Sequence, residues 1–211
     1  MKPYYQDDAV TIYHGDCRDL RCHFPEVHLE VDLLLTDPPY GIGFAAQPTD
    51  YQRFNGMKPS SWDDEKPNAE TIAYIRSFAR DQVIWGGNYF ANHLPPSRGW
   101  LSWVKPDAPP SMGNVELAWT SRDMNAKHFS WSIAATNGER VGHPTQKPLA
   151  VMTWALSFFP NAQTILDHFM GSGTTLRAAK DLGRKAIGIE IEERYCEIAA
   201  KRMAQEVFTF A

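Results

Sequence analysis

The last third of the chain alternates between short apolar runs and helical segments, and this alternation limits the possible folds more than any other feature. Apolar runs at residues 164–166 and 186–189 are each followed by a stretch with helical periodicity, at 174–182 and 192–206. A glycine-containing loop at 167–173 joins the first run to the first helix. Strand, glycine loop, helix, strand and helix in this order predict a doubly wound α/β sheet with mostly parallel strands.

The first two thirds of the chain supply more strand candidates. The nearly all-apolar run at 31–36 predicts a strand covered on both faces, and it stops at two prolines, which cannot continue a ladder. Further strands are expected at 9–13, 82–85, 100–104 and 115–120, with helices at 68–80 and after residue 148. Residues 129–135 are expected to complete an antiparallel hairpin, and residues 41–66 to form a long loop.

Composition narrows the class of protein further. With 211 residues, 43% of them hydrophobic, the chain can bury the core of one domain spanning residues 1–211. Its three cysteines form no CxxC pair, so a disulfide framework or a zinc site is not expected. A net charge of −4 means that any DNA-binding surface must be a local basic patch. Without a secretory signal or an apolar run of membrane-spanning length, a cytoplasmic protein is expected.

The loop at 167–173 has features of a nucleoside-binding turn. Asp167 ends a buried strand, while Gly171 and Gly173 permit a sharp turn and the close approach of a ligand. Glu190 ends the next strand, where it can accept hydrogen bonds from ribose hydroxyls. No lysine follows the glycines, so the phosphate-loop signature of ATP and GTP sites is missing. The alternative is a plain helix-entry turn beside a solvated glutamate.

The sequence Asp37-Pro38-Pro39-Tyr40 follows the strand candidate at 31–36. An exocyclic amine is a poor nucleophile because its lone pair is delocalised into the ring, so its methylation needs acceptors that hold both N–H groups. A carboxylate at a strand tip and a backbone carbonyl fixed by proline provide two such acceptors. An adjacent aromatic ring can stack on an extruded base. The alternative is a proline turn that only ends the strand.

Three ordered motifs together make the sequence recognisable. Asp37 to Tyr40, then His-Pro-Thr-Gln-Lys-Pro at 143–148, then Phe-Met-Gly-Ser-Gly-Thr-Thr at 169–175, resemble the amino-DNA methyltransferases over about residues 16–202. The transfer motif precedes the cofactor motif, as in the beta arrangement of that family, which is a circular permutation. The resemblance implies a Rossmann-like fold, S-adenosylmethionine as cofactor, double-stranded DNA as substrate and no metal. It also implies methylation of adenine N6 and a homodimer.

The resemblance assigns roles to individual residues. The base would be held by Asp37, Pro38, Pro39 and Tyr40. The cofactor-binding residues would be Asp16, Lys147, Asp167, Phe169, Gly171, Ser172, Gly173, Thr174 and Glu190. Within this set, Glu190 would hold the ribose, Asp16 would lie near the cofactor adenine, and the segment 143–148 would support the methionine end. The family's loop usually begins Asp-Pro-Phe, whereas this chain has His168 in place of the proline.

Several alternatives stay open on the sequence alone. N4-cytosine methylation uses the same site design, although Asp at the first motif position leans towards adenine and Ser towards cytosine. An RNA base, a protein glutamine amide and a catalytically silent DNA-binding module are further possibilities. Recognition of the DNA sequence falls to residues of about 41–142, where Asn88 could reach the cleft. The segments at Trp103 and Glu116 are expected to pack in the core, and Lys105 to be a surface charge or a phosphate contact.

Overall fold

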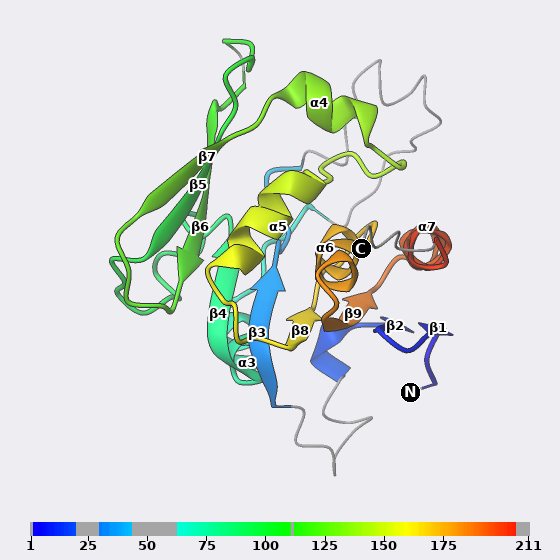
Figure 1. Cartoon of the computed structure of the whole chain (residues 1–211). Coiled ribbons are helices and arrows are strands. Elements are labelled where there is room, and N and C mark those ends of the chain that lie inside the picture. Colours follow the sequence, from blue (N-terminus) through cyan, green and yellow to red (C-terminus); the bar gives the residue numbers. More distant parts are fainter. Residues whose placement is uncertain (1, 20–29, 44–62, 111, 206–211) are drawn as a thin grey trace.

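A computed structural model describes residues 2–19, 30–43, 63–110 and 112–205 of the chain. One nine-stranded sheet organises them, with the order β1-β2-β9-β8-β3-β4-β6-β5-β7 (Figure 1). The strands are β1 (Tyr5–Gln6), β2 (Val10–His14), β3 (Val31–Thr36), β4 (Ala79–Trp85), β5 (Trp100–Val104), β6 (Val115–Thr120), β7 (Lys127–Ser130), β8 (Thr164–Asp167) and β9 (Lys185–Glu190). The helices are α3 (Ala69–Arg76), α4 (Ile133–Gly138), α5 (Leu149–Ser157), α6 (Thr174–Asp181) and α7 (Glu193–Met203), with a 3-10 turn η1 (Cys17–Asp19).

Five neighbouring strands, β2, β9, β8, β3 and β4, run parallel and confirm the doubly wound architecture. Side chains alternate between its two faces: Leu33 and Leu35 of β3 join the core under α5, α6 and α7, whereas Leu34 joins the core under α3 and η1. All three leucines are fully buried. Because helices cover both faces, the central strands can be almost continuously apolar, as the sequence of β3 indicates.

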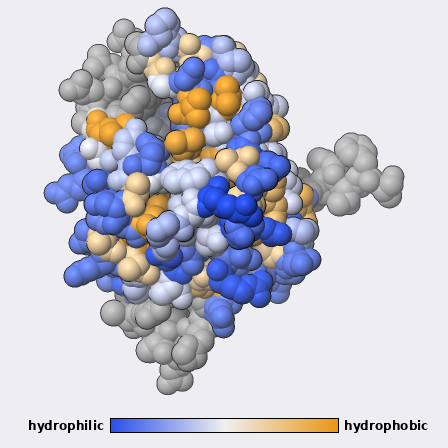
Figure 2. Space-filling model, turned by 90° about the vertical axis from the view of Figure 1, so that its left-hand side faces the viewer, coloured by the Kyte–Doolittle hydropathy of each residue, from blue (hydrophilic) through white to orange (hydrophobic). Residues whose placement is uncertain are grey.

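Beyond β4 the sheet continues as an antiparallel extension. β6 pairs antiparallel with both β4 and β5, and β7 lies at the outer edge beside β5. This extension forms the left side of Figure 1, and the same face in Figure 2 is largely hydrophilic, with hydrophobic residues in small groups. Helix α5 packs against this extension, where the Trp154 ring stacks on the Phe129 ring of β7 with 5.4 Å between centroids.

The expected antiparallel hairpin at 129–135 is wrong. β7 pairs in parallel with β5, and the chain then turns into α4. The helix forms there because its first N–H groups find acceptors: Ser132 caps the N–H of Ala135, and the Asp107 carboxylate accepts from Ile133 and Ala134. Ser132, which precedes a short apolar run, is therefore a helix cap and not part of a strand.

Two other boundaries differ from the sequence prediction. The helix expected at 68–80 begins at its Asn68 cap but ends at Arg76, because residues from Ala79 onward already pair with β3. Of the predicted loop at 41–66, residues 44–62 lie outside the described residues, as does Cys22. Cys17 and Cys196 are buried free thiols. In the described part of the chain, no helix is long and apolar enough to cross a bilayer.

Candidate active site

A cavity of about 640 Å³ opens at the carboxyl ends of the parallel strands. Ligands in open α/β sheets bind at this edge. The loops that follow β2, β3, β4, β8 and β9 all contribute to its wall. Of the thirteen residues that the sequence assigned to the site, all except Gly173 line this cavity. Gly173 instead packs behind it: at φ +77°, a Cβ there would lie 3.0 Å from the Cβ of Ala199 in α7.

The glycine loop is fixed to the strands on either side of it. Asp167 accepts hydrogen bonds from the Thr36 hydroxyl at 2.7 Å and from the Phe169 N–H at 3.0 Å. The Glu190 carboxylate accepts from the N–H of Gly171 at 2.9 Å and from that of Glu192 at 2.8 Å. Burial raises the pKa of Asp167 to about 6 and that of Glu190 to about 7.

The start of α6 and the end of β2 complete this half of the cavity. Arg202 of α7, itself buried, donates to the Ser172 carbonyl at 3.2 Å and to the Thr174 hydroxyl at 3.0 Å. After β2, Asp16 forms an ion pair with Arg18. The Gly15 N–H bonds to the Glu190 carbonyl at 2.9 Å, which places η1 beside the end of β9.

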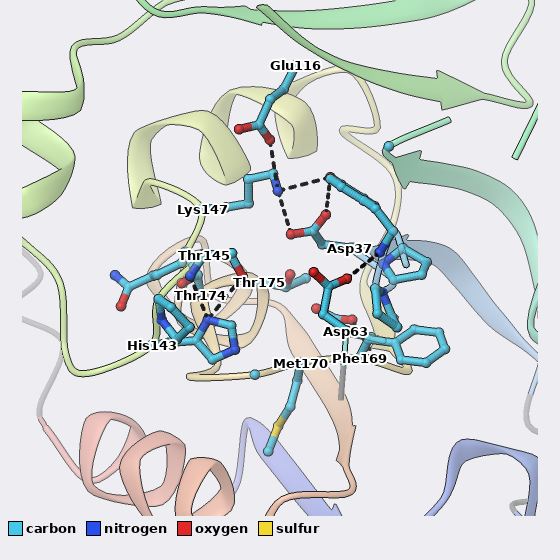
Figure 3. Close-up of a pocket in the computed structure, with 18 of the residues that line it drawn as sticks. Asp37, Asp63, Glu116, His143, Thr145, Lys147, Phe169, Met170, Thr174 and Thr175 are labelled. Carbon is cyan, nitrogen blue, oxygen red and sulfur yellow. Dashed lines mark hydrogen bonds and ion pairs between the residues drawn. The ribbon is translucent and has the colours of Figure 1, made fainter. Parts of the chain in front are cut away.

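The transfer motif lies at the end of β3, in the other half of the cavity. The Tyr40 hydroxyl donates to Asp37 Oδ1 at 2.6 Å, and the Lys147 ammonium donates to Asp37 Oδ2 at 2.5 Å (Figure 3). Burial raises the pKa of Asp37, and Lys147 opposes this effect. The Tyr40 ring stacks on Tyr89 with 4.6 Å between centroids. At Gly86, φ +67°, a Cβ would lie 2.0 Å from Tyr40 Cε1, so this approach requires glycine.

The sequence placed Lys147 among the cofactor residues, whereas the structure places its ammonium at the transfer motif. Besides Asp37, it lies 3.2 Å from the Tyr40 hydroxyl and 3.0 Å from a carboxylate oxygen of Glu116. The other Glu116 oxygen pairs with Lys105. Two anions and two cations therefore form one buried network between β3, β6 and the segment before α5.

Sequence reasoning missed Glu116 and Lys105 in this network. Glu116 was assigned to packing and Lys105 to surface charge, yet Lys105 is only 7% exposed. The pairing register of β5 and β6, with Trp103 opposite Glu116, is what brings the two charges together. The one available signal was an acid inside an otherwise apolar strand, since such an acid needs a partner when buried.

The segment 143–148 contacts both halves of the cavity. The His143 ring lies 4.4 Å from the Tyr195 ring, and a Cβ on Gly171 would meet His143 Nε2 at 3.1 Å. Burial lowers the pKa of His143 to about 3, so the ring is neutral near pH 7. Four residues later in the chain, the Lys147 ammonium reaches Asp37. One segment thus links the glycine loop to the transfer motif.

Two further residues singled out from the sequence also line the cavity wall. His168, which replaces the family's proline, is 2% exposed and has its ring 5.3 Å from that of Phe78. Burial lowers its pKa to about 3. Asn88 follows β4 and lines the cavity, as expected. Among the described residues, no group of three His, Cys, Asp or Glu side chains could hold a metal ion.

Comparison with known proteins favours the DNA methyltransferases, a class that includes both N6-adenine and N4-cytosine enzymes. A family model of the N6/N4 DNA methylases matches residues 99–201. The type II methyltransferase M2.MboI of Moraxella bovis is 27% identical, over 96% of this chain and 91% of its own length. The family model and this relative support membership of the chain in the amino-DNA methyltransferase family. The chain is a DNA methyltransferase, and its cofactor is S-adenosylmethionine.

Solved structures agree with this assignment of the methyltransferase. The complex of M1.HpyAVI with SAM is 26% identical and superposes with a TM-score of 0.67, covering 93% of this chain and all of that one. The PvuII methyltransferase, which is cytosine-N4-specific, shares the fold with a TM-score of 0.65 at 19% identity, over 99% of this chain and 91% of its own.

The cavity fits the cofactor by its own chemistry. A volume of about 640 Å³ lies in the usual range for sites of small ligands and cofactors. The absent Cβ at Gly171 accommodates the His143 ring beside the loop, and the Glu190 carboxylate offers acceptor capacity for hydroxyl groups. The positive sulfonium of the cofactor is also compatible with a cavity that contains Asp16, Asp37, Asp167 and Glu190.

Proposed function

We propose that this methyltransferase transfers a methyl group to the N6 amine of adenine in double-stranded DNA. The observation that carries the proposal is the position of the Asp37 carboxylate, which lines the same cavity as the glycine loop and is oriented by Tyr40 and Lys147. Adenine is favoured over cytosine because the motif begins with Asp, which in this family leans towards adenine, and not with Ser.

In this proposal the cofactor occupies the half of the cavity around the glycine loop. Glu190 accepts hydrogen bonds from the ribose hydroxyls, and Asp16 lies near the cofactor adenine. The backbone at Phe169, Gly171 and Ser172 contacts the cofactor, while α6 begins at Thr174 after its cap Gly173. Asp167 holds the loop through the Phe169 N–H. Lys147 acts at the transfer motif and is not needed as a direct cofactor contact.

The transfer chemistry depends on acceptors for the target amine. S-adenosylmethionine supplies an activated methyl group. A carboxylate has about four lone-pair sites, and Tyr40 and Lys147 each donate to one of those on Asp37, which leaves sites for an N–H of the base. The Pro38 carbonyl is the second acceptor. Together they draw the nitrogen lone pair out of the ring and stabilise the positive charge that develops on nitrogen.

The proton released by the methylated amine needs a base near the nitrogen. Asp37 is in contact with that amine in this proposal, and burial raises the pKa of its carboxyl group. A raised pKa makes it a better proton acceptor than an exposed aspartate. Tyr40 presents a ring to the base that leaves the duplex, backed by Tyr89.

DNA reading and assembly complete the proposal. The whole chain acts as a single domain, in which about residues 41–142, including the antiparallel extension, read the DNA sequence. Two chains associate as a homodimer, since one such small chain has little spare surface with which to grip both sides of a duplex.

Methylome sequencing tests this function directly. DNA from a methylation-free bacterial host that expresses the protein should carry N6-methyladenine in a defined sequence, and DNA from cells expressing Asp37→Ala should not. If the parent sample instead contains N4-methylcytosine, the target base is cytosine and not adenine. An unmodified genome from cells with folded protein would contradict the proposal.

A further inference from the structure

Asp63 lies against the turn of the transfer motif, although nothing in the motifs points to it. It is 3% exposed. Its Oδ1 accepts hydrogen bonds from the N–H groups of Tyr40 at 2.9 Å and Gly41 at 3.1 Å. Its own carbonyl accepts from the Gly43 N–H at 3.0 Å. The carboxylate and its bond to the motif backbone are visible below Asp37 in Figure 3.

Two consecutive N–H groups that converge on one carboxylate oxygen fix the backbone between them. This matters after Pro38 and Pro39, because neither proline has an N–H of its own to anchor the chain. Tyr40 and Gly41 therefore provide the first backbone donors after the two prolines, and both are used by Asp63.

The turn also packs closely against the segment that carries Asp63. At Gly41, φ +68°, a Cβ would lie 2.9 Å from the backbone nitrogen of Lys66. The Lys66 ammonium donates to the Tyr89 carbonyl at 3.2 Å, and the Tyr89 ring stacks on Tyr40. Residues 63–66 thus tie the motif turn to the residues behind the Tyr40 ring.

We propose that Asp63 is a positioning residue for methyl transfer. It acts through the backbone of Tyr40 and Gly41, sets the direction of the Pro38 carbonyl and the Tyr40 ring relative to Asp37, and does not touch the base. This inference rests on the proposed roles of Asp37 and Tyr40. Accurate positioning strongly affects the rate of methyl transfer, because a misplacement of about 1 Å can lower a catalytic rate on the order of a hundredfold.

Asp63→Asn and Asp63→Ala test the proposal together, with Asp64→Ala as the matched control. Asp64 is an exposed neighbouring acid that does not line the cavity. The asparagine amide oxygen can still accept both N–H groups, whereas alanine cannot. The measurement is the single-turnover transfer rate at saturating cofactor and DNA, with cofactor affinity and the melting temperature of each protein.

Asp63→Ala is expected to slow transfer by about a hundredfold while binding the cofactor with parent affinity. Asp63→Asn should stay within about tenfold of the parent, and Asp64→Ala should match it. An Asn variant as slow as the Ala variant would show that the charge itself acts, and would overturn the proposal. So would an Ala variant whose rate falls only with its folded fraction.

Asp37→Ala, measured in the same series, separates this inference from the proposed function. If Asp37→Ala keeps the parent rate, the assigned transfer motif is wrong, and the positioning role of Asp63 is wrong as well. If Asp37→Ala loses the rate while Asp63→Ala keeps it, only the role of Asp63 is wrong.

Discussion

Among single residues, Glu190 is proposed to bind the cofactor ribose, and its titration should make cofactor affinity depend on pH. Its pKa is raised to about 7 by burial, and the ionised form is the one that can accept hydrogen bonds from two hydroxyls. As pH falls through 7, the carboxyl group becomes protonated and loses acceptor capacity. Cofactor affinity, measured by calorimetry from pH 8 to pH 6, should therefore weaken by up to about tenfold per unit below the pKa.

Asp167 titrates in a neighbouring range, with its pKa at about 6, so a control variant is needed. Glu190→Gln cannot ionise and keeps the size of the side chain. It should bind the cofactor weakly at all these pH values, with a flatter pH profile. A profile with the full parent slope in Glu190→Gln would assign the dependence to Asp167 or another group.

Gly86 gives a second prediction at the residue scale. Gly86→Ala places a Cβ 2.0 Å from the Tyr40 ring and should displace it, so methyl transfer should fall well beyond any loss of stability. Gly183→Ala is the matched control, because Gly183 has a similar φ of +70° and open space around it. Both variants should lose about 1–2 kcal/mol of stability from the left-handed backbone.

Denaturant unfolding and single-turnover rates measured on both variants check this prediction. Only Gly86→Ala should lose transfer out of proportion to stability. Equal rates in the two variants would show that Tyr40 does not need the close contact with the turn after β4.

At the level of elements, the buried ion network links β3, β6 and the segment before α5. Lys147→Ala removes the cation beside Asp37 and leaves the Asp37 and Glu116 carboxylates without it. The pKa of Asp37 should rise further, since Lys147 lowers it and Glu116 raises it. The acidic limb of the pH–rate profile should therefore move to higher pH, and the rate at neutral pH should fall.

Lys105→Ala is the control for the network, because Lys105 pairs with Glu116 and has no contact with Asp37 among those resolved in the structure. Its acidic limb should move less than that of Lys147→Ala. Identical shifts in both variants would mean that Lys147 acts through the general charge of the site and not through its contact with Asp37.

Some helices and strands could be predicted from the sequence, and others could not. Local patterns predicted β3, the glycine loop and α6, because apolar runs, glycines and helical periodicity can be recognised from residues that are close in sequence. The partners of Lys147 could not be predicted, since they lie after β3 and on β6, far from Lys147 in the sequence, and only the fold brings them together. α4 was missed because part of its capping comes from Asp107, an acid distant in sequence, in addition to the local cap Ser132.

For the whole molecule, we predict a homodimer. Sedimentation at micromolar concentration should give a mass of two chains, each of 23.9 kDa. The experiment should be run with and without duplex DNA, because DNA could itself bring two chains together. A mass of one chain in both conditions would contradict the dimer and leave the active-site assignment untouched.

In the proposed function, Asp37 directs methyl transfer to the N6 amine of adenine. The most direct measurement is a single-turnover reaction with methyl-labelled cofactor and duplex DNA, followed by digestion and separation of the nucleosides. The label should appear in N6-methyldeoxyadenosine, and Asp37→Ala should bind the cofactor but transfer about a hundred- to a thousandfold more slowly. Label in N4-methyldeoxycytidine, or a folded Asp37→Ala protein that transfers at near the parent rate, would contradict the proposed function.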